Sequence, residues 1–219
     1  TSNVISIPPY ASLQGDGPLS SIIKLQYGNL SVANVSDSAF QSGGTIGSGG
    51  ATLPSNINIQ GIKFWNSNLS IERPIFNLDS ASNVRITNTA FVSNVNPGTH
   101  YPNVVEILST STATKNVTLD TVQILGGGNG LVNMGTTTTA LNVLNSYYDQ
   151  ISNVAFVLNS VDSYSSINNY FGDNVTTVSS TAGATNFVAI GETYTSGTAP
   201  RTGAYLGNLN LGVARSSSV

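Results

Sequence analysis

Three carboxylates and four tyrosines gather in the last third of the sequence, and this combination of residue types suits chemistry on a carbohydrate. The acids are Asp149, Asp162 and Asp173, and the tyrosines are Tyr147, Tyr148, Tyr164 and Tyr170. Two carboxylates about 5 Å apart serve retaining glycosidases, and a wider separation serves inverting ones. Aromatic rings beside carboxylates also suit the binding of a sugar ring. The alternative interpretation is that the acids are solvated and the tyrosines partly buried, without a catalytic role.

Other candidates for chemistry are few. His100 is the only histidine and the chain has no cysteine, so the sequence lacks the ligands that would complete a metal site. Residues 47–49 (Gly-Ser-Gly) do not have the Gly-x-Ser-x-Gly spacing of a nucleophile turn. The glycine pairs of residues 41–54 are not followed by Lys-Ser or Lys-Thr, so a phosphate-binding loop is not indicated. The sequence therefore predicts neither a metal ion nor a cofactor.

A repeated segment must position these side chains. Residues 56–64 (Asn-Ile-Asn-Ile-Gln-Gly-Ile-Lys-Phe) recur 27 residues later as residues 83–91 (Asn-Val-Arg-Ile-Thr-Asn-Thr-Ala-Phe). Apolar and polar residues alternate as in a strand, and the alternation restarts one residue out of phase at Ile62. The residue between the two phases is Gly61 in one copy and Asn88 in the other, and both types readily adopt positive φ. The pattern predicts two short strands joined by a left-handed corner.

The same frame recurs along most of the chain. The predicted corner residues are Asn34, Gly61, Asn88, Thr121, Asn145 and Asn168, with Gly191 as a weaker seventh. Their spacings are 27, 27, 33, 24, 23 and 23 residues, and Thr121 alone departs from the rule that the corner is Asn or Gly. Because asparagines at the same corner of successive repeats can hydrogen-bond to one another, we expect a ladder of their side chains.

Each period also contains a second apolar run, at residues 75–78, 104–108, 131–134 and 155–158. A period with about three short strands and no helical stretch cannot bury its apolar side alone, so successive copies must stack and share one interior. The sequence therefore predicts an all-β parallel solenoid of about six to seven coils with loop insertions. An antiparallel β-sandwich is the alternative, but a sandwich does not require one residue type at a fixed position of the frame.

The alternation also predicts which side chains lie inside. The expected interior residues are Ile57, Ile59, Phe64, Val84, Ile86, Phe91, Val117, Leu119 and Val143. Three aromatic residues, Trp65, Tyr101 and Tyr148, are expected on the outside, at contacts between subunits, where aromatic side chains are enriched.

Over residues 30–191 the chain resembles the right-handed parallel β-helix, or pectin-lyase-like, superfamily. Coils of that superfamily carry a left-handed two-residue turn with a ladder of asparagines, which is the pattern of the predicted corners. The resemblance implies a single-stranded right-handed parallel β-helix, and it is greatest to bacteriophage tail-spike and tail-fibre proteins. Because the superfamily includes lyases, hydrolases, adhesins and tail spikes, the resemblance implies a fold and not an activity.

The chain also departs from this superfamily. The triplet Gly15-Asp16-Gly17 is similar to the entry segment of tail-spike β-helices, but Pro18 follows it in place of an acidic, helix-starting run. The signatures of polygalacturonases and pectate lyases are missing, since the sequence has no paired Asp-Asp, no Gly-His-Gly and no Arg-x-Lys. Those two activities are therefore not indicated.

The composition limits the kinds of partner. Only 8% of the 219 residues are charged, against about 25% in typical soluble domains, so Ser, Thr and Asn must keep the surface hydrated. A net charge of −3 with seven basic residues argues against nucleic acid as a partner. No apolar run approaches the roughly 20 residues needed to cross a bilayer, so membrane insertion is not expected. The absence of cysteine excludes disulfides.

The frame divides the chain into three parts. We expect a linker or N-terminal cap over residues 1–20, the β-helix over residues 21–192, and a C-terminal loop with closing strands over residues 193–219, which could lead to a further domain. A bare stack exposes unpaired strand edges at its ends, and few charges protect its walls against association. Together with the resemblance to tail spikes, these features predict a homotrimer.

The sequence therefore favours a non-enzymatic structural or receptor-binding component of a viral tail fibre or tail spike, located in the virion or outside the cell. Its expected partners are a host cell-surface polysaccharide or other virion tail proteins. The alternative is a polysaccharide depolymerase, a hydrolase or lyase, acting through the acidic, tyrosine-rich coils. An ice-binding solenoid is disfavoured, because the threonine run at residues 136–139 occurs only once.

Overall fold

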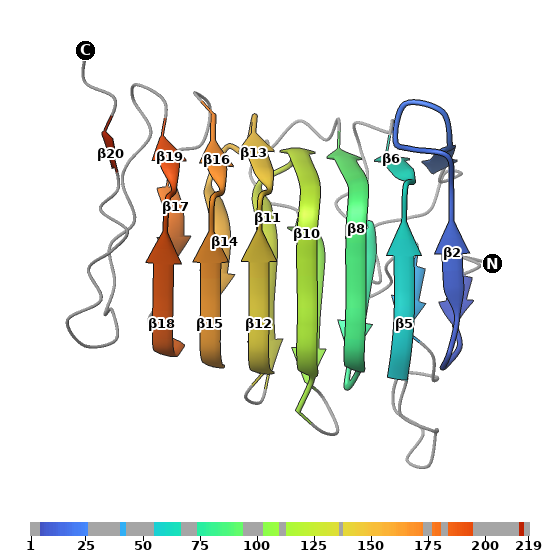
Figure 1. The fold of residues 1–219 in the computed structure, drawn as a ribbon, viewed down its shortest axis with the longest axis horizontal. Helices are drawn as coiled ribbons and strands as arrows, with labels where there is room; N and C mark the ends of the chain where they lie inside the picture. The colour runs from blue at the N-terminus through green and yellow to red at the C-terminus, as the bar shows by residue number, and fades with distance from the viewer. Residues whose placement is uncertain are drawn as a thin grey trace, which may run out of the picture.

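The structure is a computed structural model, and it describes residues 5–25, 40–42, 55–66, 74–93, 103–109, 113–135, 138–172, 177–180, 184–194 and 215–216. Within these residues the chain is all-β: it contains no helix, and every strand pair is parallel. The strands form a larger and a smaller sheet, with the larger sheet in front in Figure 1.

The smaller sheet has seven strands within the described residues. In their order across the sheet they are β1 (Ile5–Ile7), β4 (Phe40–Ser42), β7 (Phe76–Asp79), β9 (Asn103–Ser109), β11 (Asn129–Gly135), β14 (Val154–Leu158) and β17 (Thr177–Ser180). Four of these strands, β7, β9, β11 and β14, contain the second apolar runs expected from the sequence. They therefore form a sheet of their own.

The larger sheet has thirteen strands within the described residues. They are β2 (Ser12–Gln14), β3 (Ile22–Leu25), β5 (Ser55–Gln60), β6 (Lys63–Asn66), β8 (Ser82–Ser93), β10 (Lys115–Gly126), β12 (Thr138–Leu144), β13 (Tyr147–Asp149), β15 (Val161–Ile167), β16 (Tyr170–Phe171), β18 (Ala184–Ile190), β19 (Thr193–Tyr194) and β20 (Arg215–Ser216). From β4 to β19 the chain passes alternately between the two sheets. In each sheet, the strand of one period pairs with the equivalent strand of the period before it.

The register aligns the repeats position by position. In the larger sheet Ile59 pairs with Ile86, Ile86 with Leu119, and Leu119 with Val143. Side chains of one position therefore form columns that run across the strands. All nine residues expected in the interior are buried, so the predicted alternation is confirmed.

Aromatic rings join the two sheets through the interior. Phe64 and Phe91 stack in one column with centroids 5.4 Å apart, and Phe76 of the smaller sheet meets both rings edge-on at 6.1 Å. Further along the same column Tyr148 and Phe171 stack at 5.4 Å, and Phe156 of the smaller sheet meets them edge-on. The two sheets therefore pack face to face, and these rings fill the space between them.

The expected outward position of Tyr148 is wrong, because this side chain is fully buried. Tyr148 lies three residues after the corner Asn145, which is the position of Phe64 relative to Gly61. Since Phe64 points inward, the same frame places Tyr148 in the aromatic column. Trp65, one residue further along the frame than Phe64, is half-buried on the outward side.

The predicted corners have the left-handed backbone conformation. The φ angle is 69° at Gly61, 45° at Asn88, 56° at Thr121, 48° at Asn145, 55° at Asn168 and 66° at Gly191. The backbone of Gly15 also lies close to Gly61: a Cβ on Gly61 would be 2.4 Å from the carbonyl oxygen of Gly15. Glycine is therefore required at this corner for space as well as for φ.

The expected ladder of corner side chains includes an aspartate. Asn168 Nδ2 donates to Asn145 Oδ1 at 3.3 Å, and Asn145 Nδ2 donates to Asp120 Oδ1 at 3.0 Å. The Thr121 hydroxyl donates to the same Asp120 oxygen at 3.1 Å. Where the corner residue is threonine, the preceding aspartate thus supplies the acceptor of the ladder.

A second column of left-handed residues lies five positions before the first, and the sequence analysis missed it. Its members are Tyr10, Asn56, Asn83, Asn116, Ala140, Ser163 and Asn186, with φ from 49° to 61°. Asn116 Nδ2 donates to Asn83 Oδ1 at 3.0 Å, and Asn83 Nδ2 donates to Asn56 Oδ1 at 3.3 Å. The column is less visible in the sequence because Ala140 and Ser163 replace asparagine.

Part of the segment expected to be a linker or cap continues the two sheets. In this segment β1 pairs with β4, and β2 pairs with β5. Several expectations fall outside the described residues: those for Asn34, His100, Tyr101 and Asp173, and most of the C-terminal loop with closing strands expected over residues 193–219.

The left-handed corner predicts an asymmetric response to substitution at Asn88. Asn88→Val should lower the free energy of unfolding by about 1–3 kcal/mol, because a β-branched residue is strained at positive φ. Asn88→Gly should cost much less, since glycine adopts this φ freely. Chemical denaturation measures both, with Thr87→Val as the control one residue before the corner. Equal losses for the valine and glycine variants at residue 88 would contradict a left-handed corner.

Candidate functional site

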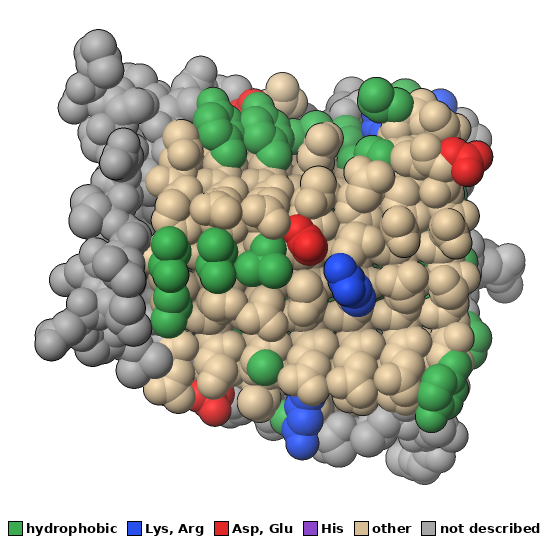
Figure 2. Space-filling view, in the orientation of Figure 1, with side chains coloured by type: hydrophobic (Ala, Val, Ile, Leu, Met, Phe, Trp, Pro, Cys, Tyr) green, Lys and Arg blue, Asp and Glu red, His purple; other side chains and the backbone are tan. Residues whose placement is uncertain are grey.

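The candidate site lies on an outward band that follows the first corner column. We define the edge band as two rows of residues, two and four positions after the corners, together with the residues of β3 that pair with them. The first row contains Ile22, Lys63, Ala90, Gln123, Tyr147, Tyr170 and Thr193, and the second contains Lys24, Trp65, Val92, Leu125 and Asp149. Figure 2 shows hydrophobic side chains at both ends of this band.

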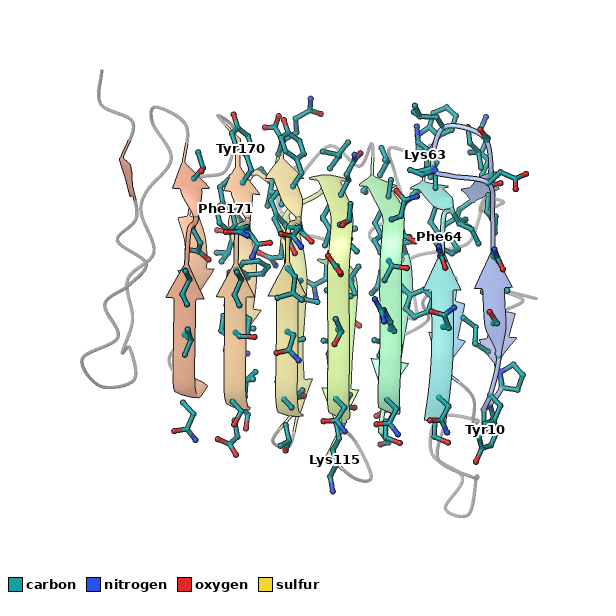
Figure 3. The ribbon with its side chains drawn as sticks, viewed as in Figure 1. Tyr10, Lys63, Phe64, Lys115, Tyr170 and Phe171 are labelled. Atoms are coloured by element: carbon teal, nitrogen blue, oxygen red, sulfur yellow. The ribbon has the colours of Figure 1, made fainter. Side chains whose placement is uncertain are left out.

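Tyr147, Tyr170 and Asp149 form one cluster in the edge band. The two tyrosine rings are stacked, with centroids 5.0 Å apart and planes inclined by 7°. The Tyr147 hydroxyl donates to Asp149 Oδ2 at 2.8 Å, and the backbone N–H of Gln150 donates to Asp149 Oδ1 at 2.8 Å. Figure 3 labels Tyr170, at the edge of the larger sheet above β16. We call these three residues the Tyr–Asp cluster.

The position of the Asp149 side chain depends on Gly172, the residue that follows β16. A Cβ on Gly172 would lie 2.4 Å from both Cγ and Oδ1 of Asp149. No real Cβ makes such a contact, so the carboxylate occupies the space that a side chain at residue 172 would need. The absence of a side chain at Gly172 therefore leaves the room in which the Asp149 carboxylate lies.

The chemistry of the Tyr–Asp cluster suits a sugar. Tyrosine combines an apolar ring with a polar hydroxyl, and it is common where one side of a ligand is apolar and the other is wet. An ionised carboxylate only accepts hydrogen bonds, and it has about four lone-pair sites. Asp149 accepts hydrogen bonds from the Tyr147 hydroxyl and the Gln150 N–H, so lone pairs remain for sugar hydroxyls. Tyr147 is 36% exposed, which leaves part of the ring accessible.

Two of the four candidate tyrosines do not belong to a binding surface. Tyr148 and Tyr164 are 0% and 1% exposed, and both rings pack edge-on against Phe156. They pack in the interior between the sheets, where a sugar has no access. The proposal that they bind a ligand is therefore wrong, because both residues fall on inward positions of the frame.

The structure does not bring Asp149 and Asp162 together. Asp162 is level with Thr139 and Lys115, at one end of β10, and it accepts a hydrogen bond from Asn186 Nδ2 at 2.8 Å. Asp149 is level with Leu125, ten residues further along β10. At about 3.3 Å per residue this is roughly 30 Å along the strand, against at most about 10 Å in glycosidases. Asp173 lies outside the described residues.

Two buried acids were missed by the sequence analysis. Glu192 accepts a hydrogen bond from the Ser166 hydroxyl, in a buried group that also includes Asn169. Glu106 lies in the smaller sheet and accepts a bond of 2.7 Å from Asn103 Nδ2. Burial raises the pKa of Glu106 above its ordinary value of 4.5, although the bond from Asn103 opposes this shift. Neither acid is exposed enough to meet a large ligand.

Comparisons with other proteins identify no relative: no family model, curated protein or solved structure matched the chain. Within the described residues no three His, Cys, Asp or Glu side chains are grouped as metal ligands. The same part of the chain contains no helix long and apolar enough to cross a membrane. The function must therefore be argued from the surface of this chain.

The buried Glu106 predicts a defined dependence of stability on pH. Because its pKa is raised in the folded state, the folded protein binds more protons than the unfolded chain between about pH 4.5 and the folded-state pKa. The stabilisation from protonated Glu106 is fully present below that pH and is lost as the pH rises through the folded-state pKa. Glu106→Gln should remove this loss and be more stable than the parent at pH 7.

Denaturation at several pH values measures this effect, and Asp16→Asn is the control because Asp16 is exposed. An unchanged difference in stability between the parent and Glu106→Gln across the acidic range would contradict the raised pKa.

Proposed function

We propose that this chain is a non-enzymatic, extracellular or virion-borne fibre component that binds a host cell-surface glycan. The observation that carries the proposal is the Tyr–Asp cluster, in which two stacked tyrosine rings and one carboxylate are held on a rigid sheet. A single carboxylate beside aromatic rings suits binding, whereas glycoside hydrolysis generally needs a pair. No pair of described acids favours the alternative of a depolymerase.

We propose a right-handed parallel β-helix as the fold of this component. Three features support it: the chain alternates between two parallel sheets, the repeats pair in register, and two columns of left-handed residues mark the corners. Such a fold is a rigid support on which exposed side chains keep fixed spacings. The assignment to a viral tail is supported by the sequence resemblance to tail spikes and tail fibres alone.

We also propose that the native unit is a homotrimer. One outward row of the larger sheet is polar at Gln60, Thr87 and Asp120, and then becomes apolar at Leu144, Ile167 and Ile190. Figure 2 shows this row of hydrophobic side chains over β12, β15 and β18. An apolar stripe on a wall with few charges suits contact with a second copy, so the three aliphatic residues would lie between subunits.

The glycan proposal predicts a loss of binding in variants of the Tyr–Asp cluster. Tyr170→Ala and Asp149→Asn should each weaken binding to host-surface polysaccharide by about tenfold, through lost ring contact or lost acceptor strength. Calorimetric titration measures the affinity, and Tyr10→Ala is the control because Tyr10 is 77% exposed and far from the cluster. Release of reducing ends during the titration would instead indicate a depolymerase.

The trimer proposal predicts a mass near three times 22.7 kDa in light scattering. Ile167→Asp should lower the mass to that of one chain, because the new charge would be buried at the contact. Thr87→Asp is the matched control, since it adds the same charge in the same row outside the apolar stripe. A parent protein of 22.7 kDa at micromolar concentration would refute the trimer.

A further inference from the structure

A second cluster occupies the opposite end of the edge band. It consists of Lys24 in β3 and of Lys63 and Trp65 in β6, and we call it the Lys–Trp cluster. Figure 3 labels Lys63, which extends from the end of the larger sheet farthest from Tyr170. In Figure 2 blue and green side chains lie close together at this end of the band.

Both lysines of the Lys–Trp cluster reach the same indole ring. The ammonium nitrogen of Lys24 lies 5.1 Å from the centroid of the Trp65 ring, and that of Lys63 lies 5.3 Å from it. Parallel pairing places Lys24 beside Trp65 in the neighbouring strand. Lys63 is two residues before Trp65, so it projects from the same face of the strand. Trp65 is half-buried, which leaves part of its ring exposed.

The two ammonium groups form a local concentration of positive charge. Since both lie near one centroid, they are at most about 10 Å apart, which is close to the Debye length of about 8 Å at physiological ionic strength. Among the residues that the structure describes, neither ammonium has a carboxylate partner. Two of the three lysines of the chain and its only tryptophan therefore meet at one place.

We propose that the Lys–Trp cluster is a binding subsite for an anionic sugar unit, specifically a uronate of an acidic polysaccharide. The carboxylate of the uronate lies between the two ammonium groups and relieves their repulsion. The apolar face of the sugar ring packs on the exposed part of Trp65, next to Ile22 and Val92 of the same band. A neutral sugar supplies only the second of these contacts.

The edge band connects this subsite to the Tyr–Asp cluster. Three strand pairings separate Trp65 from Asp149, through Val92 and Leu125, and at about 4.8 Å per strand the separation is roughly 14 Å. A linear polysaccharide lying along the stack of strands therefore reaches both clusters. The anionic subsite nevertheless consists of different residues from the proposed glycan site, so each can be tested separately.

The sole tryptophan provides a direct readout of this subsite. Titration with polygalacturonate should change the emission of Trp65, and titration with neutral dextran should leave it unchanged. The double variant Lys24→Gln/Lys63→Gln should bind polygalacturonate at least about tenfold more weakly, because both charge-assisted contacts are lost. Binding to the parent should also weaken as salt is added.

Lys115→Gln is the control, because Lys115 is exposed at the far end of β10 and its substitution removes a lysine charge away from the Lys–Trp cluster. Denaturation curves establish that all variants are folded. Three results would overturn the proposal: no change in Trp65 emission with polygalacturonate, an equal change with dextran, or equal affinities for the double variant and Lys115→Gln. Unchanged binding of host-surface polysaccharide by Tyr170→Ala, with an intact Trp65 response to polygalacturonate, would refute the proposed function and leave the anionic subsite standing.

Discussion

The structure depends on backbone corners that require positive φ at two positions of each period from β5 to β19. For residues other than glycine a left-handed conformation costs roughly 1–2 kcal/mol, and asparagine reduces this cost through local hydrogen bonds of its short side chain. Asn83 and Asn116 of one column, and Asn145 and Asn168 of the other, bond to their neighbours in adjacent periods. These corners are therefore stabilised by the neighbouring period when it lies in register beside them. The corners thus link local conformation to the register of the whole stack.

Register then decides what the surface presents. Because equivalent positions align across strands, two outward rows after the first corner column become the edge band, with lysines and tryptophan at one end and tyrosines and aspartate at the other. The rows are held by parallel sheets and by the stacked rings of Phe64, Phe91, Tyr148 and Phe171. Because only 8% of the residues are charged, each exposed charge has few other charges near it on the surface.

Much of the fold was predictable because the repeat is visible in residue types. The spacing of Gly61, Asn88, Asn145 and Asn168 predicted the first corner column, and the alternation beside it predicted the interior. The second corner column was missed because Ala140 and Ser163 give no signal of positive φ. Tyr148 was misplaced because its aromatic type was given more weight than its position in the frame. The Lys–Trp cluster could not be predicted, since Lys24 and Trp65 become neighbours only through the pairing of β3 with β6.

Successive periods lie in one register, with equivalent residues adjacent across the strands. The chain has no cysteine, so introduced pairs report on it without interference. Thr118 and Asn142 are partners in neighbouring strands, and so are Asn142 and Ser165. This register predicts that cysteines at residues 118 and 142, or at 142 and 165, form a disulfide on mild oxidation. Cysteines at 118 and 165, about 10 Å apart across two strand spacings, should not, because bridged Cα atoms lie within about 7 Å. A disulfide between residues 118 and 165, or none between residues 118 and 142, would contradict this register.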